Sequence, residues 1–407
     1  MDSVGTKISL RPIEVNYHLS VSLKIIQYIG TWLPKGKHRS MYKFYTICSC
    51  ITILGIYLFV QIVNLITIWG DIEKMVAGAF LLMTNTVHAL KVVVILRCQK
   101  RIQLLLDTVN SEMFNRCNDK YKYILNYYTW SGIFHHIAYQ SFGTVAVVCW
   151  GFTPIANIIT GKGRHLPMDG WYPYDTTKTP AFEITCLHQS VAVIIGCFHN
   201  VAMDTLVTGL LTVACCQLEI LKCNIYSLGK QEHSEEFSIS EGIKDQDSPE
   251  TVLYTLKRHI QHHNVIISFV KEIENIFGTT ILLQFFVNGF IICISSFHIA
   301  QMKSYTAPEL IGMTMYMCCM TYQIFIYCWH GNELYLQSQS VALSAYSGAW
   351  WNCSQQYKRS LLVIIARANK PFNLTAGNLM TISLKTFMEI LRTSYSLFTV
   401  LQSTTMN

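Results

Sequence analysis

Seven long apolar stretches, separated by polar connections, dominate the hydrophobicity pattern of this 407-residue chain. A helix needs about 20 mainly apolar residues to cross the roughly 30 Å hydrocarbon core of a bilayer, and each stretch reaches that length. The third and fourth exceed it, so we expect them to tilt or to project beyond the bilayer. The pattern predicts seven transmembrane helices, at residues 44–69, 75–96, 130–160, 184–218, 276–300, 307–329 and 376–402.

The last stretch differs from the others because it carries charges and hydroxyl groups. At helical spacing one polar face collects Lys385, Glu389, Arg392, Ser396, Thr399 and Ser403. A charged side chain at the centre of a membrane helix costs about 2.5 to 3.5 kcal/mol, so it usually faces a partner, the protein interior or water. Glu389 and Arg392 are three residues apart and are predicted to form a structural ion pair. The pattern leaves open whether this face lines water or is buried against other helices.

Composition and charge then fix the class and the orientation. Hydrophobic residues make up 51% of the chain and charged residues 14%, which excludes an ordinary soluble protein. Lys and Arg number seven in residues 1–43, six in 97–122, six in 222–271 and four in 358–370, against one, three and one in the alternate connections. The positive-inside rule therefore predicts a cytoplasmic N-terminus and an extracellular C-terminus, the reverse of a G protein-coupled receptor.

Other partners and processing signals are not expected. No short apolar segment with a cleavage site precedes residue 44, so we predict no cleavable signal peptide. The net charge of +7 indicates contact with anionic inner-leaflet lipid rather than nucleic acid. His262 and His263 are adjacent, so their side chains point about 100° apart on a helix and make a poor metal pair. We expect no metal and no cofactor.

Three connections carry their own predictions. The outer connection 161–183 is rich in Gly, Pro and aromatic residues and is expected to fold over the mouth of the bundle, although it could be a simple spacer. The polar, acidic stretch 230–250 is predicted to be a flexible cytoplasmic loop. Residues 331–375 combine an amphipathic segment with the short apolar patch Leu361–Ala366, which predicts a cytoplasmic layer of helices that joins subunits. All of these parts belong to a single domain, residues 1–407.

A series of residues in the second half of the chain carries a family resemblance. The specific matches span about 80 C-terminal residues: Gln323, Tyr327, Cys328, Gly331–Leu334, Ala345, Tyr346, Trp350 or Trp351, Tyr357, Lys358, Leu361–Ile365, Arg367, Ala368, Lys370, Pro371, Ala376, Gly377, Ser383, Thr386, Phe387, Ile390, Leu391, Ser394–Ser396, Phe398 and Thr399. Weaker matches are Asp204–Leu206, Gln217–Glu219, His263, Phe269, Glu274, Phe277 and Gln284. In these residues the chain resembles the insect odorant receptors, a family of seven-span ligand-gated cation channels with an internal N-terminus.

The resemblance implies a function and partners. It implies a plasma-membrane subunit of olfactory neuron dendrites that binds a volatile odorant and forms a heterotetrameric cation channel with a common co-receptor. The last helix would line the pore, with Ser394, Phe398, Thr399, Leu401 and Gln402 at the pore and its outer gate. A G protein-coupled receptor and a transporter are the alternatives, but DRY, NPxxY and CWxP motifs are absent and no inverted repeat is evident. An enzyme is the least favoured class.

The candidate ligand residues follow from the predicted orientation. A volatile odorant is small and mainly apolar, so its pocket should be aromatic and aliphatic with few polar groups. Each candidate could equally be a packing residue, and Trp150 could belong to the aromatic belt. His88 and His188 could hydrogen-bond an ester, an alcohol or a carbonyl, or be satisfied structurally. The candidates in the outer halves of the spans are Phe80, Met83, Thr84, Val87, His88, Gly143, Val147, Trp150, His188, Ala192, Ile195, Met315, Tyr316 and Cys319.

Overall fold

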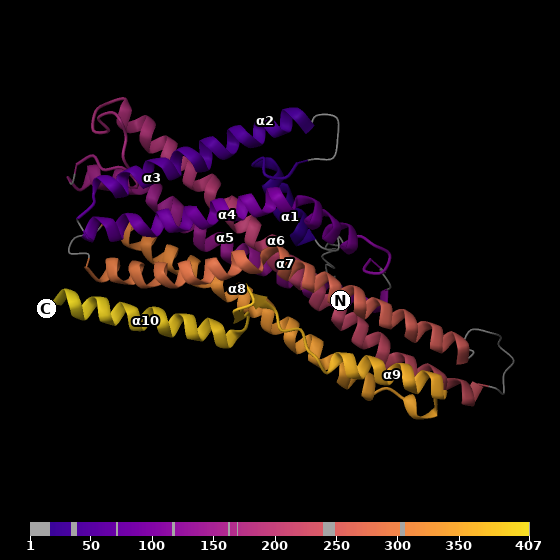
Figure 1. The fold of residues 1–407 in the computed structure, drawn as a ribbon. Coiled ribbons are helices and arrows are strands. Elements are labelled where there is room, and N and C mark those ends of the chain that lie inside the picture. The colour runs from indigo at the N-terminus through magenta and orange to yellow at the C-terminus, as the bar shows by residue number, and fades with distance from the viewer. Residues whose placement is uncertain are drawn as a thin grey trace, which may run out of the picture.

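A computed structural model describes residues 17–33, 39–70, 72–115, 119–161, 163–168, 170–238, 249–301 and 306–406. The described chain is mainly helical (Figure 1). Its elements are α1 Tyr17–Tyr28, α2 Arg39–Ser49, η1 Cys50–Gly55, α3 Ile56–Thr67, α4 Ile72–Val109, η2 Asp119–Tyr121, α5 Lys122–Ile159, α6 Ala181–Ser238, α7 Pro249–Gln301, α8 Ala307–Tyr346, η3 Trp350–Asn352, α9 Gln355–Ala368, β1 Thr375–Ala376, β2 Met380–Thr381 and α10 Leu384–Met406.

The first six predicted spans are confirmed as helices. Among the described residues, six helical segments are long and apolar enough to cross a membrane: the continuous α2–α3 segment and the helices α4 to α8. α10 falls outside that set because its charges and hydroxyls lower its hydropathy. The flexible loop predicted at 230–250 is partly wrong, since α6 stays helical to Ser238, while residues 239–248 lie outside the described part.

Helix α6 forms the centre of the bundle. Every residue from Val201 to Leu218 is buried, on all sides of the helix, because α1, α5, α7 and α8 pack around this segment. A helix that is apolar and buried on every side gains stability from packing along its whole circumference. α6 therefore holds the other helices in place and carries the residues that meet between them.

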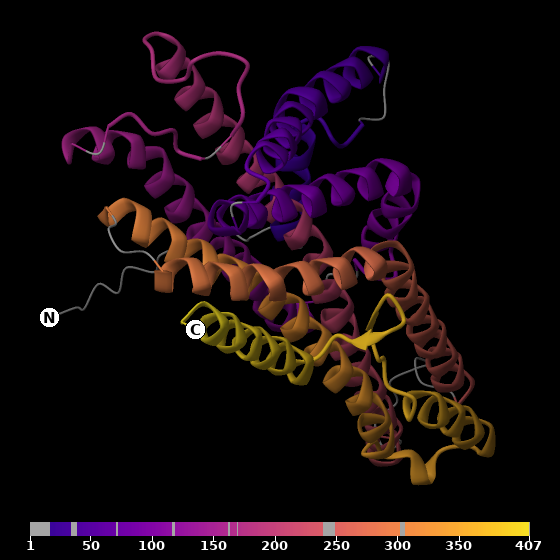
Figure 2. The same ribbon diagram turned by 60° about the vertical axis from the view of Figure 1, so that its left-hand side comes forward.

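An arm of four helical segments extends beyond the predicted spans. It consists of the C-terminal part of α6, the N-terminal part of α7, the C-terminal part of α8 and the whole of α9, and it lies opposite the end that bears the C-terminus (Figures 1 and 2). Leu361 and Ile364 of α9 are buried, and α9 packs against α7 and α8. The apolar patch Leu361–Ala366 thus lies within α9 and contributes Leu361 and Ile364 to the packing of the arm.

The last predicted span begins eight residues later than expected. Residues 375–381 form a two-stranded hairpin in which Ala376 pairs with Met380, and α10 starts only at Leu384. Gly377 and Asn378 occupy the turn with φ of 57° and 59°. Such a turn requires positive φ at both central positions, which Gly and Asn tolerate best. The sequence pattern missed the hairpin because each strand has only two residues.

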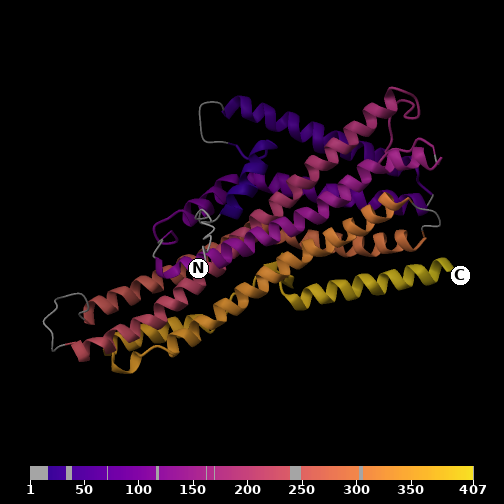
Figure 3. The same ribbon diagram turned by 180° about the vertical axis from the view of Figure 1, so that it is seen from behind.

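One side of α10 packs on the bundle and the other side is uncovered. α10 lies along α7 and α8 at the edge of the molecule (Figures 1 and 3). On the packed side, the Phe387 ring lies 5.6 Å from that of Phe325, and Ser394 Oγ donates to the carbonyl of Gly289 at 2.9 Å. The uncovered side carries the whole polar face predicted from the sequence, at 385, 389, 392, 396, 399 and 403.

Two predictions about α10 side chains need correction for the single chain. Glu389 lies 3.8 Å from Lys385 Nζ, and no ion pair joins Glu389 to Arg392 in the described part of the chain. The four-residue spacing brings Glu389 and Lys385 onto the same exposed face. Ser394 is 2% exposed and faces α7, so it does not share the uncovered face with Thr399 and Leu401.

Candidate functional site

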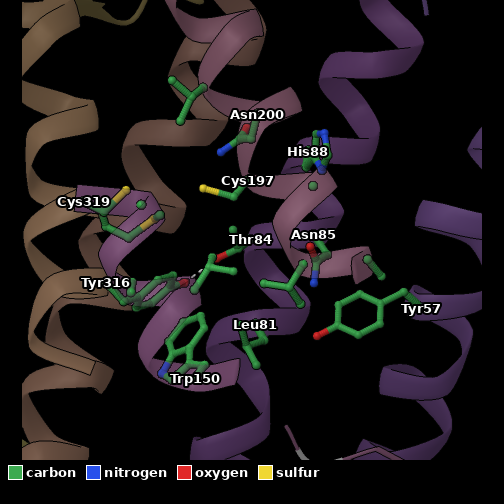
Figure 4. A pocket seen from close by; sticks show the side chains of 18 of the residues that line it. Tyr57, Leu81, Thr84, Asn85, His88, Trp150, Cys197, Asn200, Tyr316 and Cys319 are labelled. Carbon is green, nitrogen blue, oxygen red and sulfur yellow. Dashed lines mark hydrogen bonds between the residues drawn. The ribbon is translucent and has the colours of Figure 1, made fainter. Parts of the chain in front are cut away.

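A cavity of about 80 Å³ lies between α3, α4, α5, α6 and α8 (Figure 4). Aliphatic, aromatic and thiol side chains make up most of its wall, and a few amide, hydroxyl and imidazole groups interrupt it. Its lining residues are Leu54, Tyr57, Leu81, Thr84, Asn85, His88, Tyr139, Gly143, Ala146, Val147, Trp150, Ala192, Val193, Gly196, Cys197, Asn200, Val201, Tyr316, Cys319 and Met320. A small apolar ligand with one polar group fits this chemistry.

An aromatic cluster closes one side of the cavity. The Tyr316 ring lies 5.4 Å from that of Phe80 and 5.2 Å from that of Trp150, within the range of favourable aromatic pairs. Tyr316 and Thr84 hydroxyls lie 2.6 Å apart and tie α8 to α4. A Cβ atom at Gly312 would approach Trp150 Cδ1 to 2.8 Å, so the absence of a side chain there makes room for the indole.

A buried ion pair lies directly beyond the cavity floor. Lys91 Nζ is 2.6 Å from Asp204 Oδ1, and the two side chains are 6% and 1% exposed. The Asp204 carboxylate also accepts hydrogen bonds from the Tyr139 hydroxyl, the Tyr327 hydroxyl and the Gln323 amide. A buried charge is costly unless it is paired and hydrogen-bonded, and this carboxylate satisfies both conditions. Four helices, α4, α5, α6 and α8, therefore meet at one carboxylate.

Two histidines continue the polar layer. His88 Nε2 lies 3.1 Å from His199 Nδ1, and His199 Nε2 lies 2.7 Å from the Thr31 hydroxyl. His88 borders the cavity, whereas His199 faces the segment that follows α1. The chain of contacts connects the cavity wall on α4 with the N-terminal part of the structure.

The connection between α5 and α6 covers the end of the cavity that lies away from the buried ion pair. Met168 is buried, and its backbone N–H and carbonyl both bond the Gln189 side chain on α6. The Tyr57 hydroxyl at the cavity wall lies 2.7 Å from Met168 Sδ. Burial raises the pKa of Tyr172 in the same connection. A second cavity of about 340 Å³ lies under this connection and shares Leu81 and Trp150 with the first.

The family follows from a comparison with known proteins. The model of the family described as 7tm Odorant receptor matches residues 71–395 of this chain, which includes every helix around the cavity except α3. This chain belongs to the odorant receptor family. Its relatives are receptors rather than enzymes, and its apolar helices make it a multi-pass membrane protein.

Individual relatives cover most of this odorant receptor. Odorant receptor 10 of Aedes albopictus is 24% identical, in an alignment that covers 86% of this chain and 89% of the relative. Odorant receptor Or2 of Anopheles gambiae is 26% identical, in an alignment that covers 87% of this chain and 90% of the relative. The solved insect olfactory receptor OR5 from Machilis hrabei, in complex with eugenol, matches with a TM-score of 0.82 at 18% identity and covers 96% of this chain and 99% of its own. That structure supports the fold.

The receptor structure brings many of the predicted ligand residues together around the 80 Å³ cavity. Those that line it are Thr84, His88, Gly143, Val147, Trp150, Ala192, Tyr316 and Cys319. Phe80 instead packs on Tyr316 and lines the second cavity. The other predicted residues line neither cavity: Met83, Val87, His188, Ile195 and Met315.

The sequence reasoning missed residues on every helix that borders the cavity. On α6 the cavity face runs through Ala192, Gly196 and Asn200, whereas the predicted set was 188, 192 and 195, about one turn nearer the start of the helix. The residue pattern of α6 does not mark where along the helix the cavity lies. Asn200 was detectable as an amide within a span. Leu54 and Tyr57 carry no amide or charge that would mark them within the first span.

Proposed function

We propose that this odorant receptor binds a small volatile molecule in the cavity between α3, α4, α5, α6 and α8 and, together with the common odorant co-receptor, gates a non-selective cation channel in the plasma membrane. The observation that carries the proposal is the cavity itself, because it lies between five helices, is mainly apolar and is interrupted by few polar groups. Volatile odorants are small and mainly apolar, so burial in such a site supplies most of their binding free energy.

Access is proposed to run through the second cavity. Leu81 and Trp150 separate the two cavities, and the connection that contains Met168 covers the outer one. Rotation of these side chains would admit a ligand without separation of the helices. Rotamer changes of this kind take place in picoseconds to nanoseconds at exposed positions and more slowly in packed ones.

Coupling to α10 is proposed to follow a continuous polar route. From Asp204 beyond the cavity floor, Gln323 bonds the carboxylate and accepts from Asn288 Nδ2 at 2.8 Å. The carbonyl of the next residue, Gly289, accepts from Ser394 of α10. A ligand that shifts α6 relative to α8 would alter this route and change the equilibrium between closed and open states.

The uncovered polar face of α10 supports a pore. Lys385, Glu389, Arg392, Ser396 and Thr399 are all exposed in the single chain, so another surface or water must face them in a membrane. Copies of α10 from four subunits around an axis would supply a water-lined path. Phe398, Leu401 and Gln402 near its outer end would form the gate, by exclusion of water from an apolar ring.

The test fills the cavity without a clash. A Cβ atom at Gly196 would meet nothing within 4 Å, and Gly196 lies on the cavity face of α6. Gly196→Leu therefore places a side chain in the ligand volume and leaves the packing of the helix intact. Ile194→Phe is the matched control, because Ile194 lies on the same helix and is 42% exposed on its outer side.

Currents are recorded from cells that express each variant with the co-receptor, in excised patches without GTP. We expect Gly196→Leu to raise the half-activating concentration of every activating volatile about tenfold or more, where tenfold corresponds to 1.4 kcal/mol. Ile194→Phe should respond like the wild type. An unchanged response of Gly196→Leu would refute the cavity as the ligand site, and currents that require GTP would refute the channel.

A further inference from the structure

Asn200 is the amide group at the inner end of the cavity. Ala192, Gly196 and Asn200 are four residues apart along α6, so they form one face that runs down the cavity wall. The first two bring no polar atom in their side chains. Asn200 therefore puts hydrogen-bonding capacity at the floor of a wall that is otherwise apolar on this helix.

The orientation of the Asn200 amide is fixed by its neighbour. Lys91 Nζ lies 2.9 Å from Asn200 Oδ1, and an ammonium group can only donate hydrogen bonds. The carbonyl oxygen of the amide must therefore face Lys91, and the NH₂ group must face the other way. In Figure 4 the nitrogen of Asn200 points into the cavity, toward Cys197.

Lys91 cannot easily turn away and release this amide. It is held by Asp204 at 2.6 Å, and the carboxylate is itself held by Tyr327 and Gln323. Charge-assisted hydrogen bonds are roughly twice as strong as neutral ones. The amide is thus preorganised by a buried ion pair, and a ligand need not spend binding free energy on its orientation.

The neighbouring donors in the wall have acceptors within the protein. Thr84 Oγ1 donates to the carbonyl of Phe80, so the Tyr316 hydroxyl donates to Thr84. Tyr139 donates to Asp204, the Tyr57 hydroxyl contacts Met168, and the Asn85 amide donates to Gln61 Oε1. Asn200 Nδ2, by contrast, donates to no residue that the structure describes. Asn200 is half-buried at the cavity wall, so this donor is open to an acceptor on a ligand.

We propose that Asn200 determines ligand selectivity by donating a hydrogen bond to an acceptor oxygen, and that the receptor therefore prefers volatile ketones, aldehydes or esters to hydrocarbons of the same shape. This inference rests on the proposed ligand cavity. Lys91 and Asp204 act as positioning residues that aim the amide. The apolar part of the ligand lies along Ala192 and Gly196, with its oxygen at the inner end.

The test compares ligands that differ only at the acceptor. Methyl ketones found active in a screen of volatiles are paired with the 2-methyl-1-alkenes in which a methylene group replaces the oxygen. The half-activating concentrations of both are measured for the wild type, Asn200→Leu and Asn200→Asp. Asn200→Asp retains the size of the side chain and an acceptor for Lys91, but offers no donor to the cavity.

In the wild type we expect the ketone to be preferred, and in both variants we expect that preference to fall about threefold to tenfold, the range for one neutral hydrogen bond. The alkene response reports that each variant is folded and gated. The double variant Lys91→Met with Asp204→Asn removes both charges together and leaves the Asn200 amide free to turn, so its preference, measured as the ratio of alkene to ketone half-activating concentrations, should fall in the same way. A change in gating or stability alone would move both concentrations together and leave that ratio unchanged.

Three results would overturn the inference, and they are distinguishable from one another. An unchanged ketone preference in both Asn200 variants, while Gly196→Leu raises the half-activating concentration of every volatile, would leave the cavity as the ligand site and remove Asn200 from recognition. A Gly196→Leu receptor that still responds fully would overturn the cavity and the inference together. A screen in which no activating volatile carries an acceptor oxygen would also overturn it.

Discussion

Removal of the Asp204 charge should destabilise the receptor far more than removal of an exposed one. Asp204→Asn keeps the size of the side chain but removes the negative charge beside the Lys91 ammonium, whose side chain is only 6% exposed. Apart from residue 204, Asn200 Oδ1 is the one acceptor that the described residues offer to Lys91 Nζ. It also weakens three hydrogen bonds to the carboxylate, from Tyr139, Gln323 and Tyr327.

The magnitude follows from the burial of the pair. Loss of one partner from a buried ion pair costs about 3 to 5 kcal/mol, because the remaining charge stays in a medium of low dielectric constant. At about 2 °C per kcal/mol for a large domain, the midpoint of thermal unfolding should fall by about 6 to 10 °C. The double variant with Lys91→Met should recover part of that loss, since it leaves no unpaired charge.

The control is a second ion pair of equal length. Arg101 Nε lies 2.6 Å from Glu272 Oε1, but these side chains are 45% and 33% exposed. Exposed pairs contribute at most about 1 kcal/mol, so Glu272→Gln should lower the midpoint by no more than about 2 °C. Receptor solubilised in detergent is heated at one scan rate, and the fraction that stays monodisperse is read by fluorescence-detected gel filtration. Equal shifts for Asp204→Asn and Glu272→Gln, or a double variant no more stable than Asp204→Asn, would refute the reasoning.

Three further predictions concern the arm, a helix contact and the topology. A Cβ atom at Gly331 would lie 2.4 Å from the carbonyl oxygen of Ile382, so Gly331→Ala should destabilise the receptor by about 1 to 3 kcal/mol through overpacking and lower its thermal midpoint. Gly196→Ala, whose Cβ atom would meet nothing within 4 Å, should leave the midpoint unchanged, and equal midpoints for the two variants would contradict the prediction. Burial, helped by a nearby arginine, lowers the pKa of His263 in the arm from 6.5 to about 4. The free energy of unfolding should therefore fall by about 2 kcal/mol between pH 7.5 and pH 5, and the His263→Gln variant should lack this part of the pH dependence. Asn373 is exposed and begins an Asn-Leu-Thr glycosylation sequon between α9 and α10. The predicted topology places this segment in the cytoplasm, so treatment with a glycosidase should leave the mass of the protein unchanged. A shift in mass would show that the topology is reversed.

The predicted pH dependence has a definite sign. The neutral form of His263 is favoured in the folded state, while the unfolded chain takes up a proton near pH 6.5. Stability is therefore complete above that pH and is lost progressively as the pH falls toward about 4. A wild-type midpoint that falls no more than the His263→Gln midpoint over this range would contradict the assignment.

The number and the approximate places of the first six spans were readable from the sequence because the bilayer imposes a minimum apolar length, whereas the helical extensions of the arm were not. A run of about 20 apolar residues is hard to place anywhere but in a membrane span, so the first six spans matched helices. The polar face of α10 was equally readable, because charges at spacings of three and four residues must share one side. Both features depend on one helix at a time.

Which side of each helix faces a neighbour was decided only by the tertiary structure. In the bilayer, lipid and protein core are both apolar, so the hydrophobic pattern of α6 does not mark its cavity face, and Asn200 was overlooked. The partner of Asp204 is 113 residues away on α4, and Glu389 pairs with Lys385 instead of Arg392 in the single chain. Sequence thus determined the spans and the family, while packing between helices decided the cavity, its buried ion pair and the surface that α10 leaves uncovered, because those depend on residues far apart in the chain meeting in space.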